Sequence, residues 1–130
     1  MIALPITSTV AAGLAIFMFP LTVQISMRRK SLGNVVFGDA DDMVLRRRIR
    51  AFGNFVEYAP ICLLLMALME LQGTPSTWLW VVGGLLAAGR VIHALGMLFA
   101  DTPVPRAIGM LMTYAAFLIP AAWLLLNLQS

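Results

Sequence analysis

Residues 50–60 read RAFGNFVEYAP and lead directly into an apolar run at residues 61–71. Within this stretch Arg50, Asn54 and Glu57 are spaced i, i+4 and i+7, so they share one face of a helix. An ionised side chain at the centre of a membrane helix costs about 2.5–3.5 kcal/mol on insertion scales. Such a residue faces a partner or a cavity, so this inward face is either a functional site or interhelical packing.

The composition of the chain is that of a membrane protein. Of its 130 residues, 61% are hydrophobic, whereas a soluble domain has roughly 45–50%. A chain of this length cannot hide so much apolar surface from water, so lipid must surround most of it. We expect a single membrane domain covering residues 1–130. The one cysteine, Cys62, excludes an internal disulfide and is expected to be a small buried packing residue.

Four long apolar segments alternate with short polar ones, which predicts an all-α integral membrane protein with a four-transmembrane-helix bundle. Each segment reaches the ~20 residues that are needed to cross the hydrocarbon layer. The first segment lacks a basic region before it and is too long for a signal peptide. The expected helices cover residues 3–25, 43–71, 78–99 and 104–128.

All nine Lys and Arg residues fall on one side of this expected topology. Positive charge marks the cytoplasmic side, so both termini are predicted to lie on the non-cytoplasmic side. The charges flank or enter apolar helices and do not cover a soluble face, so no nucleic-acid partner is expected. The nine are Arg28, Arg29, Lys30, Arg46, Arg47, Arg48, Arg50, Arg90 and Arg106.

Charged residues near the ends of the second helix can be explained without a functional site. The basic residues 46–48 are interpreted as interfacial anchors that meet anionic head groups. Glu70 lies where this helix leaves the membrane, and exposure to water explains it. Asp41 or Asp42 is expected to cap the start of the helix. Neither the acidic residues 39–42 nor any other cluster has the spacing of a calcium or zinc site, so no metal is expected.

A second polar face is expected on the third helix, near its cytoplasmic end. Arg90 and His93 are spaced i and i+3 there. A lone histidine in such a place is more often a hydrogen-bonded packing residue than a ligand. Gly83, Gly84 and Ala88 offer small residues for close contact with another helix.

The pattern RAxxNxxEYxP at residues 50–60 closely resembles the second-helix signature of the MAPEG family. The name stands for membrane-associated proteins in eicosanoid and glutathione metabolism. Residues 90–96, followed by Arg106, fit the third-to-fourth helix region of that family, and residues 37–42 are similar to its bacterial members. The resemblance covers nearly the whole chain; the second-helix motif is fairly specific, and the third-helix motif alone is weak.

This resemblance implies a homotrimer of MAPEG-like four-helix subunits in a bacterial inner membrane. It implies that glutathione, as co-substrate, binds between neighbouring subunits near the cytoplasmic side. The implied activity is a glutathione transferase or peroxidase that conjugates or reduces lipophilic electrophiles with the glutathione thiolate. By position in the motifs, the residues that would bind glutathione are Arg50, Asn54, Glu57, Tyr58, Arg90 and His93.

Arg106 is the candidate catalytic residue, by its place at the start of the fourth helix. A free thiol with a pKa near 8.5 is only about 3% thiolate at pH 7. Lowering that pKa by ~2 units requires ~2.7 kcal/mol of preferential stabilisation, which one guanidinium in a partly dry pocket can supply. The alternative for Arg106 is another head-group anchor.

Two other functions compete with the enzyme. Some eukaryotic members have tyrosines on the third helix where this chain has His93 and Met97, so a phenol donor is missing. The family also includes non-catalytic members, so the alternative is a lipid-binding or scaffold trimer. A small multidrug transporter has a similar length, but it should carry a carboxylate in its first helix, and residues 3–25 contain no charge.

Overall fold

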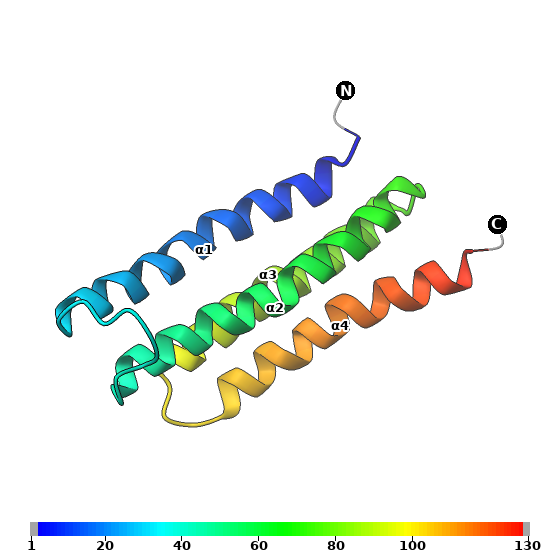
Figure 1. The fold of residues 1–130 in the computed structure, drawn as a ribbon. Helices are drawn as coiled ribbons and strands as arrows, with labels where there is room; N and C mark the ends of the chain where they lie inside the picture. Colours follow the sequence, from blue (N-terminus) through cyan, green and yellow to red (C-terminus); the bar gives the residue numbers. More distant parts are fainter. Residues whose placement is uncertain (1–2, 129–130) are drawn as a thin grey trace.

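Residues 3–128 are described by the computed structural model, and they form four long helices (Figure 1). Each of these helices is long and apolar enough to cross a membrane. The predicted all-α architecture with four transmembrane helices is therefore confirmed. The helices are α1 (Pro5–Ser31), α2 (Met43–Leu71), α3 (Ser76–Phe99) and α4 (Val104–Leu126).

The observed helix ends differ from the predicted ones mainly in α1. This helix continues past its predicted end at residue 25 to Ser31, and its last turn contains the basic residues 28–30. Positive side chains are favourable there because the helix macrodipole is negative at its C-terminus. The other differences are small: α3 begins at Ser76 instead of residue 78, and α4 ends at Leu126 instead of residue 128.

The helices α2 and α3 form the centre of the bundle, with α1 and α4 on either side (Figure 1). The most extensive packing is between α3 and α4, and within residues 3–128 the helices α1 and α4 do not pack against each other. The first turn of α1 and the last turn of α4 lie at the same end (Figure 1). We call the opposite end the arginine end; it holds the basic residues 28–30, 46–48, Arg50 and Arg106.

Close contact between α3 and α4 depends on glycines that pattern reading did not single out. A Cβ atom on Gly109 would lie 2.6 Å from the backbone nitrogen of His93 and 2.7 Å from the carbonyl oxygen of Gly89. Of the small residues that were expected to mediate helix contact, Gly83 does so against α1 and α2, whereas Gly84 faces open space. The close contact of α3 with α4 therefore involves Gly109 and Gly89, which directly follows the expected small residue Ala88.

The core is apolar and is built mainly from α1, α2 and α3. Cys62 is fully buried within it, at 0% exposure, which confirms its predicted packing role. Methionine side chains fill much of the space beside it, as their flexible thioethers suit irregular gaps. Other buried members are Val10, Leu14, Met66, Met69, Leu79, Val82 and Leu86.

Glu70 has a structural role that the sequence interpretation missed. Its carboxylate oxygens accept hydrogen bonds from the backbone N–H groups of Ile6, at 2.9 Å, and Thr7, at 2.8 Å. These are donors of the first turn of α1, which has no side-chain cap of its own. Explaining Glu70 by exposure alone was therefore wrong: it caps α1 from the end of α2, and its charge matches the positive dipole there.

The connection between α1 and α2 is held by Asp42. This side chain accepts from the backbone N–H of Leu45 at 2.7 Å, so of the two capping candidates the structure selects Asp42. Arg28 donates to both oxygens of the same carboxylate, at 3.0 and 2.7 Å. The Arg28 guanidinium, followed by the Leu45 N–H group, lowers the pKa of Asp42 from 3.8 to about 2. The connection is thus fixed to the ends of both helices.

Candidate functional site

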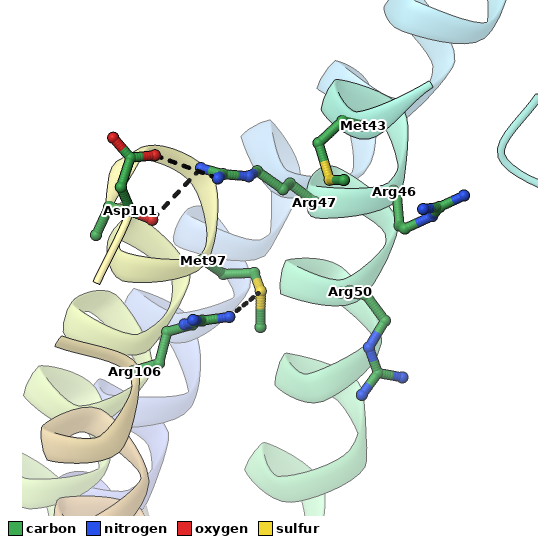
Figure 2. Close-up of a pocket in the computed structure, with 8 residues that line it drawn as sticks. Met43, Arg46, Arg47, Arg50, Met97, Asp101 and Arg106 are labelled. Atoms are coloured by element: carbon green, nitrogen blue, oxygen red, sulfur yellow. Dashed lines mark hydrogen bonds and ion pairs between the residues drawn. The ribbon is translucent and has the colours of Figure 1, made fainter. Parts of the chain in front are cut away.

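A cavity of about 410 Å³ lies at the arginine end, beside the first turns of α2 and α4 (Figure 2). Four of the residues that line it are arginines, three from α2 and one from α4. Clustered positive charge at a partly enclosed surface concentrates anions, so this lining favours an anionic ligand. The lining residues are Met43, Arg46, Arg47, Arg50, Met97, Ala100, Asp101 and Arg106.

Arg106 is the arginine with an unused buried donor. Its Nε is buried and has no hydrogen-bond partner among residues 3–128. Its Nη1 lies 4.0 Å from the sulfur of Met97, and a thioether is only a weak acceptor (Figure 2). A buried N–H group without an acceptor is costly, so this guanidinium is available to an acceptor that enters the cavity.

The α2 arginines differ in how strongly they are already engaged. Arg46 donates to Asp39 at 2.6 Å, so part of its charge is neutralised locally. Arg47 makes two long hydrogen bonds of 3.4 Å, to the carbonyl oxygen of Ala100 and to Asp101. Arg50 is exposed and makes no hydrogen bond or ion pair within the described part of the chain. Arg50 and Arg106 are therefore the arginines with the most capacity for a ligand.

Arg90 lies in the interior of the bundle and does not border this cavity. It is 1% exposed, and its Nε and Nη2 donate to Thr113 Oγ1 on α4 at 3.0 and 2.6 Å. Its Nη1 donates to the backbone and side-chain oxygens of Asn54 on α2. The donors of this guanidinium are thus directed to acceptors of the same subunit, and it joins three helices.

Tyr58 belongs to an aromatic cluster next to Arg90. The guanidinium carbon of Arg90 lies 5.5 Å from the centre of the Tyr58 ring, a cation–π geometry. The same ring stacks on Phe117, with 6.2 Å between centroids, and meets Tyr114 edge-on at 6.3 Å. Neither α4 residue was assigned to a site from the sequence, although Tyr114 lies two turns beyond Arg106 on nearly the same face.

The predicted inward orientation of Arg50 and Glu57 is wrong for a single subunit. Both side chains are exposed, and Asn54 between them is half-buried. The face of α2 that packs against the bundle carries Ala51 and Phe55 instead. The physical reason is that these apolar side chains lie about 100–160° around the helix from the charged ones and fit the core. Arg50 and Glu57 therefore lie on the outer surface of the subunit, whereas Asn54 contacts Arg90.

The predicted site residues thus fall into separate places. Arg50 and Arg106 border the arginine-lined cavity, and Asn54 meets Arg90 inside the bundle. His93 is buried, at 4% exposure, where the backbone of Gly109 crosses it, which favours its interpretation as a packing residue. Sequence reasoning missed the cavity residues Met43, Arg46, Arg47, Ala100 and Asp101; the dense arginine run was the available signal.

Comparison with known proteins gives a family and curated relatives. A family model described as MAPEG family matches residues 4–126. Inner membrane protein YecN of Escherichia coli, from strain K12 and from strain CFT073 of serotype O6:H1, is 40% identical over 62 residues. That match covers 48% of this chain and 47% of the relative, so the chain spans about half the length of the curated relatives it matches. No solved structure matches.

Proposed function

Because this chain belongs to the MAPEG family of membrane proteins in eicosanoid and glutathione metabolism, we propose that it is a glutathione transferase or peroxidase of the bacterial inner membrane. Its proposed substrates are glutathione and a lipophilic electrophile that enters from the bilayer. The observation that carries this proposal is the cavity of about 410 Å³ in which Arg106 holds a buried N–H group without a partner.

The charges around the cavity suit glutathione. This peptide has two carboxylates and one ammonium group, so it carries excess negative charge. The guanidinium of arginine presents paired N–H groups that match a carboxylate, and Arg50 and Arg47 are placed to receive one. Lipophilic electrophiles partition into the membrane, so a cavity at the end of apolar helices brings both substrates together.

The exposed polar face of α2 supports a trimer as part of the proposal. Arg50 and Glu57 are exposed on a membrane-spanning helix, and ionised side chains facing lipid are costly. A neighbouring subunit would cover this face and close the cavity from the outside. In that arrangement Glu57 accepts hydrogen bonds from the ammonium group of glutathione, while arginines hold its carboxylates.

Arg106 is proposed to stabilise the thiolate of bound glutathione. The thiol proton passes to solvent, and the sulfur forms a bond to the electrophilic carbon as the leaving group departs with its bonding electrons. In the peroxidase reaction, one hydroperoxide is reduced to an alcohol and water while two glutathione molecules are oxidised to their disulfide. A shift of ~2 units in the thiol pKa, or ~2.7 kcal/mol, makes most of the bound thiol reactive at pH 7.

The orientation in the membrane is part of the same proposal. Positive residues mark the cytoplasmic side, so the arginine end would face the cytosol and both termini the opposite side. The cytosol keeps glutathione mostly in its reduced form. A cavity on the cytosolic side is therefore exposed mainly to reduced glutathione and not to its disulfide.

The test is the ultraviolet absorption of thiolate when reduced glutathione is mixed with the purified full-length protein in detergent at neutral pH. We expect a stoichiometric signal for the wild type and for Lys30→Ala, which removes an exposed charge of the same end. Arg106→Ala should lose the signal while native mass spectrometry shows an unchanged oligomer. Absence of a signal in the wild type at saturating glutathione contradicts the proposal.

A non-catalytic binding trimer is the second candidate, and the surroundings of Arg106 and Arg90 favour it. Met97 places a thioether sulfur, which donates no hydrogen bond, beside Arg106, where a hydrogen-bond donor would help hold a thiolate. The donors of Arg90 are engaged inside the subunit. This function predicts that glutathione or lipid raises the melting temperature without a thiolate signal, and turnover of any electrophile counts against it.

A further inference from the structure

A second cavity, of about 350 Å³, lies on the neighbouring face of the first turns of α2, between α1 and the end of α3. It shares Met43, Arg47 and Asp101 with the arginine-lined cavity but contains its own polar group from α1. Nothing in the proposed reaction with glutathione uses this space. Its lining residues are Gln24, Met43, Val44, Arg47, Arg48, Leu98, Phe99 and Asp101.

Gln24 brings a buried amide to this cavity. Its Nε2 is buried and has no hydrogen-bond partner among residues 3–128. Gln24 lies on α1 one turn before the basic residues 28–30, and its backbone oxygen accepts a bond of 2.7 Å from Arg48 Nη1. Leaving a buried amide N–H without an acceptor is unfavourable, so an acceptor from outside the chain is expected here.

The chemistry of the polar groups selects an anion. Arg48 has only donors, and apart from its bond to Gln24 the guanidinium retains further N–H groups. The carboxylate of Asp101 also borders the cavity, but it is exposed to water and paired with Arg47 at 3.4 Å. The lining of the cavity therefore contains two guanidinium groups and one carboxylate, which leaves an excess of positive charge. The Gln24 amide adds an uncharged donor.

Apolar side chains on the rim indicate where the anion comes from. Phe99 is 75% exposed and Val44 is 43% exposed, and both line the cavity. In a membrane these side chains contact lipid tails at the level where apolar helix surface gives way to charge. Basic pockets between helices at this level suit phosphate head groups, because tails and phosphate are then bound together.

We propose that this second cavity is a binding site for the phosphate group of an anionic membrane phospholipid. Gln24 Nε2 and the guanidinium of Arg48 donate hydrogen bonds to the phosphate oxygens, and Phe99 contacts an acyl chain. Occupation would satisfy the buried amide and tie the C-terminal half of α1 to α2. The two side chains that would bind the phosphate, Gln24 and Arg48, do not border the arginine-lined cavity, although the two cavities share Arg47.

The experiment is a lipid titration of the delipidated full-length protein in detergent, followed by native mass spectrometry. The probes are dioleoylphosphatidylglycerol and dioleoylglycerol, which has the same tails but no phosphate. We expect the phosphate lipid to saturate at one molecule per subunit. Gln24→Glu and Arg48→Gln should each weaken its binding roughly tenfold, as expected for the loss of one charge-assisted hydrogen bond.

Lys30→Gln is the matched control, because it removes an exposed positive charge at the same end without touching the cavity. It should retain the affinity of the wild type. Gln24→Glu has nearly the same shape as the natural side chain, so it tests the site even where Arg48→Gln fails to fold. Equal weakening in Gln24→Glu and Lys30→Gln overturns the proposal, as does equal binding of dioleoylglycerol.

A competition with glycerol phosphate identifies the source of the phosphate. Failure of millimolar glycerol phosphate to displace the lipid supports the membrane lipid as the occupant. Displacement that is lost in Gln24→Glu supports recognition of the phosphate group itself and overturns the requirement for a lipid. Displacement that is equal in Gln24→Glu and in the wild type overturns the assignment of Gln24.

Discussion

Arg90 on α3 donates hydrogen bonds to both the backbone oxygen and the side-chain oxygen of Asn54 on α2. The same guanidinium reaches Thr113 on α4, so three helices meet at one buried side chain. Arg50 and Arg106 border the arginine-lined cavity from α2 and α4. The distance between these two walls is therefore set from inside the bundle by a residue that does not itself line the cavity.

Arg90→Lys should destabilise the protein by roughly 2 kcal/mol, because one ammonium group cannot replace the fork that bonds Asn54 and Thr113. It should also weaken glutathione binding by loosening the cavity walls. Thermal unfolding in detergent and calorimetry measure the two effects. Arg50→Lys is the control for stability and should stay within about 0.5 kcal/mol. Equal stability of the two variants would show that the hydrogen bonds of Arg90 do not contribute to the free energy of unfolding.

Gly109→Ala should destabilise the α3–α4 contact by about 1–3 kcal/mol, as expected for an overpacked interior. Its Cβ would lie 2.6 Å from the backbone nitrogen of His93, and backbone cannot move aside as a flexible side chain does. Gly84→Ala is the matched control on α3, since no atom lies within 4 Å of its Cβ. We expect that variant to be neutral or more stable, because alanine favours a helix. Unfolding in detergent measures both, and a neutral Gly109→Ala contradicts the close contact.

The ion pair of Asp42 with Arg28 should make stability fall in acid. The pKa of Asp42 is lowered from 3.8 to about 2 in the folded protein. A lowered folded pKa contributes stability that is fully present above the unfolded value and is lost as the pH falls through the folded value, here between about pH 4 and pH 2. Asp42→Ser keeps an N-terminal cap without the charge. It should therefore remove most of the dependence of stability on pH while the helix content stays nearly unchanged.

Unfolding of both proteins across that pH range measures the effect of Asp42. The pKa of Asp39 is also lowered, mainly by its hydrogen bond with Arg46. A smaller acid dependence should therefore remain in Asp42→Ser. An unchanged slope in this variant would show that the ion pair with Arg28 does not contribute to stability.

Asp101→Asn should raise the affinity for glutathione roughly twofold to threefold. The substitution removes the carboxylate from the edge of the arginine-lined cavity and frees Arg47, which is bound to it at 3.4 Å. The effect is small because Asp101 is exposed, and exposed ion pairs contribute up to about 1 kcal/mol. Calorimetry at low and high salt measures it, and high salt should reduce the difference. A lower affinity at low salt would mean that Asp101 holds Arg47 in its binding position.

The local features of this chain could be predicted because each depends on residues close in sequence. Hydrophobic runs of sufficient length predicted the four helices, and the acidic residues before Met43 predicted a cap at Asp41 or Asp42, of which the structure selects Asp42. The burial of Cys62 followed from its apolar neighbours. The MAPEG motif at residues 50–60 gave the family, which a match over residues 4–126 then confirmed.

The interpretations that failed were those in which the partner is distant in sequence. Glu70 was assigned to water, but the first turn of α1 lies next to it in the folded chain. The interpretation of Arg46 and Arg47 as head-group anchors was incomplete and stays a prediction: both residues also line the arginine-lined cavity. A charge at a helix end looks the same in sequence whether it faces water or another helix.

The sequence by itself determined that this chain is a bundle of four membrane helices with most of its positive charge at one end, because length, apolarity and charge act along the chain. It also placed Arg50, Asn54 and Glu57 on one helical face. Only the tertiary structure decided that Arg50 and Glu57 lie on the outside of the subunit, whereas Asn54 accepts hydrogen bonds from the buried Arg90. The rotation of each helix is set by how its apolar side chains fit those of its neighbours, and that fit is a property of packed surfaces.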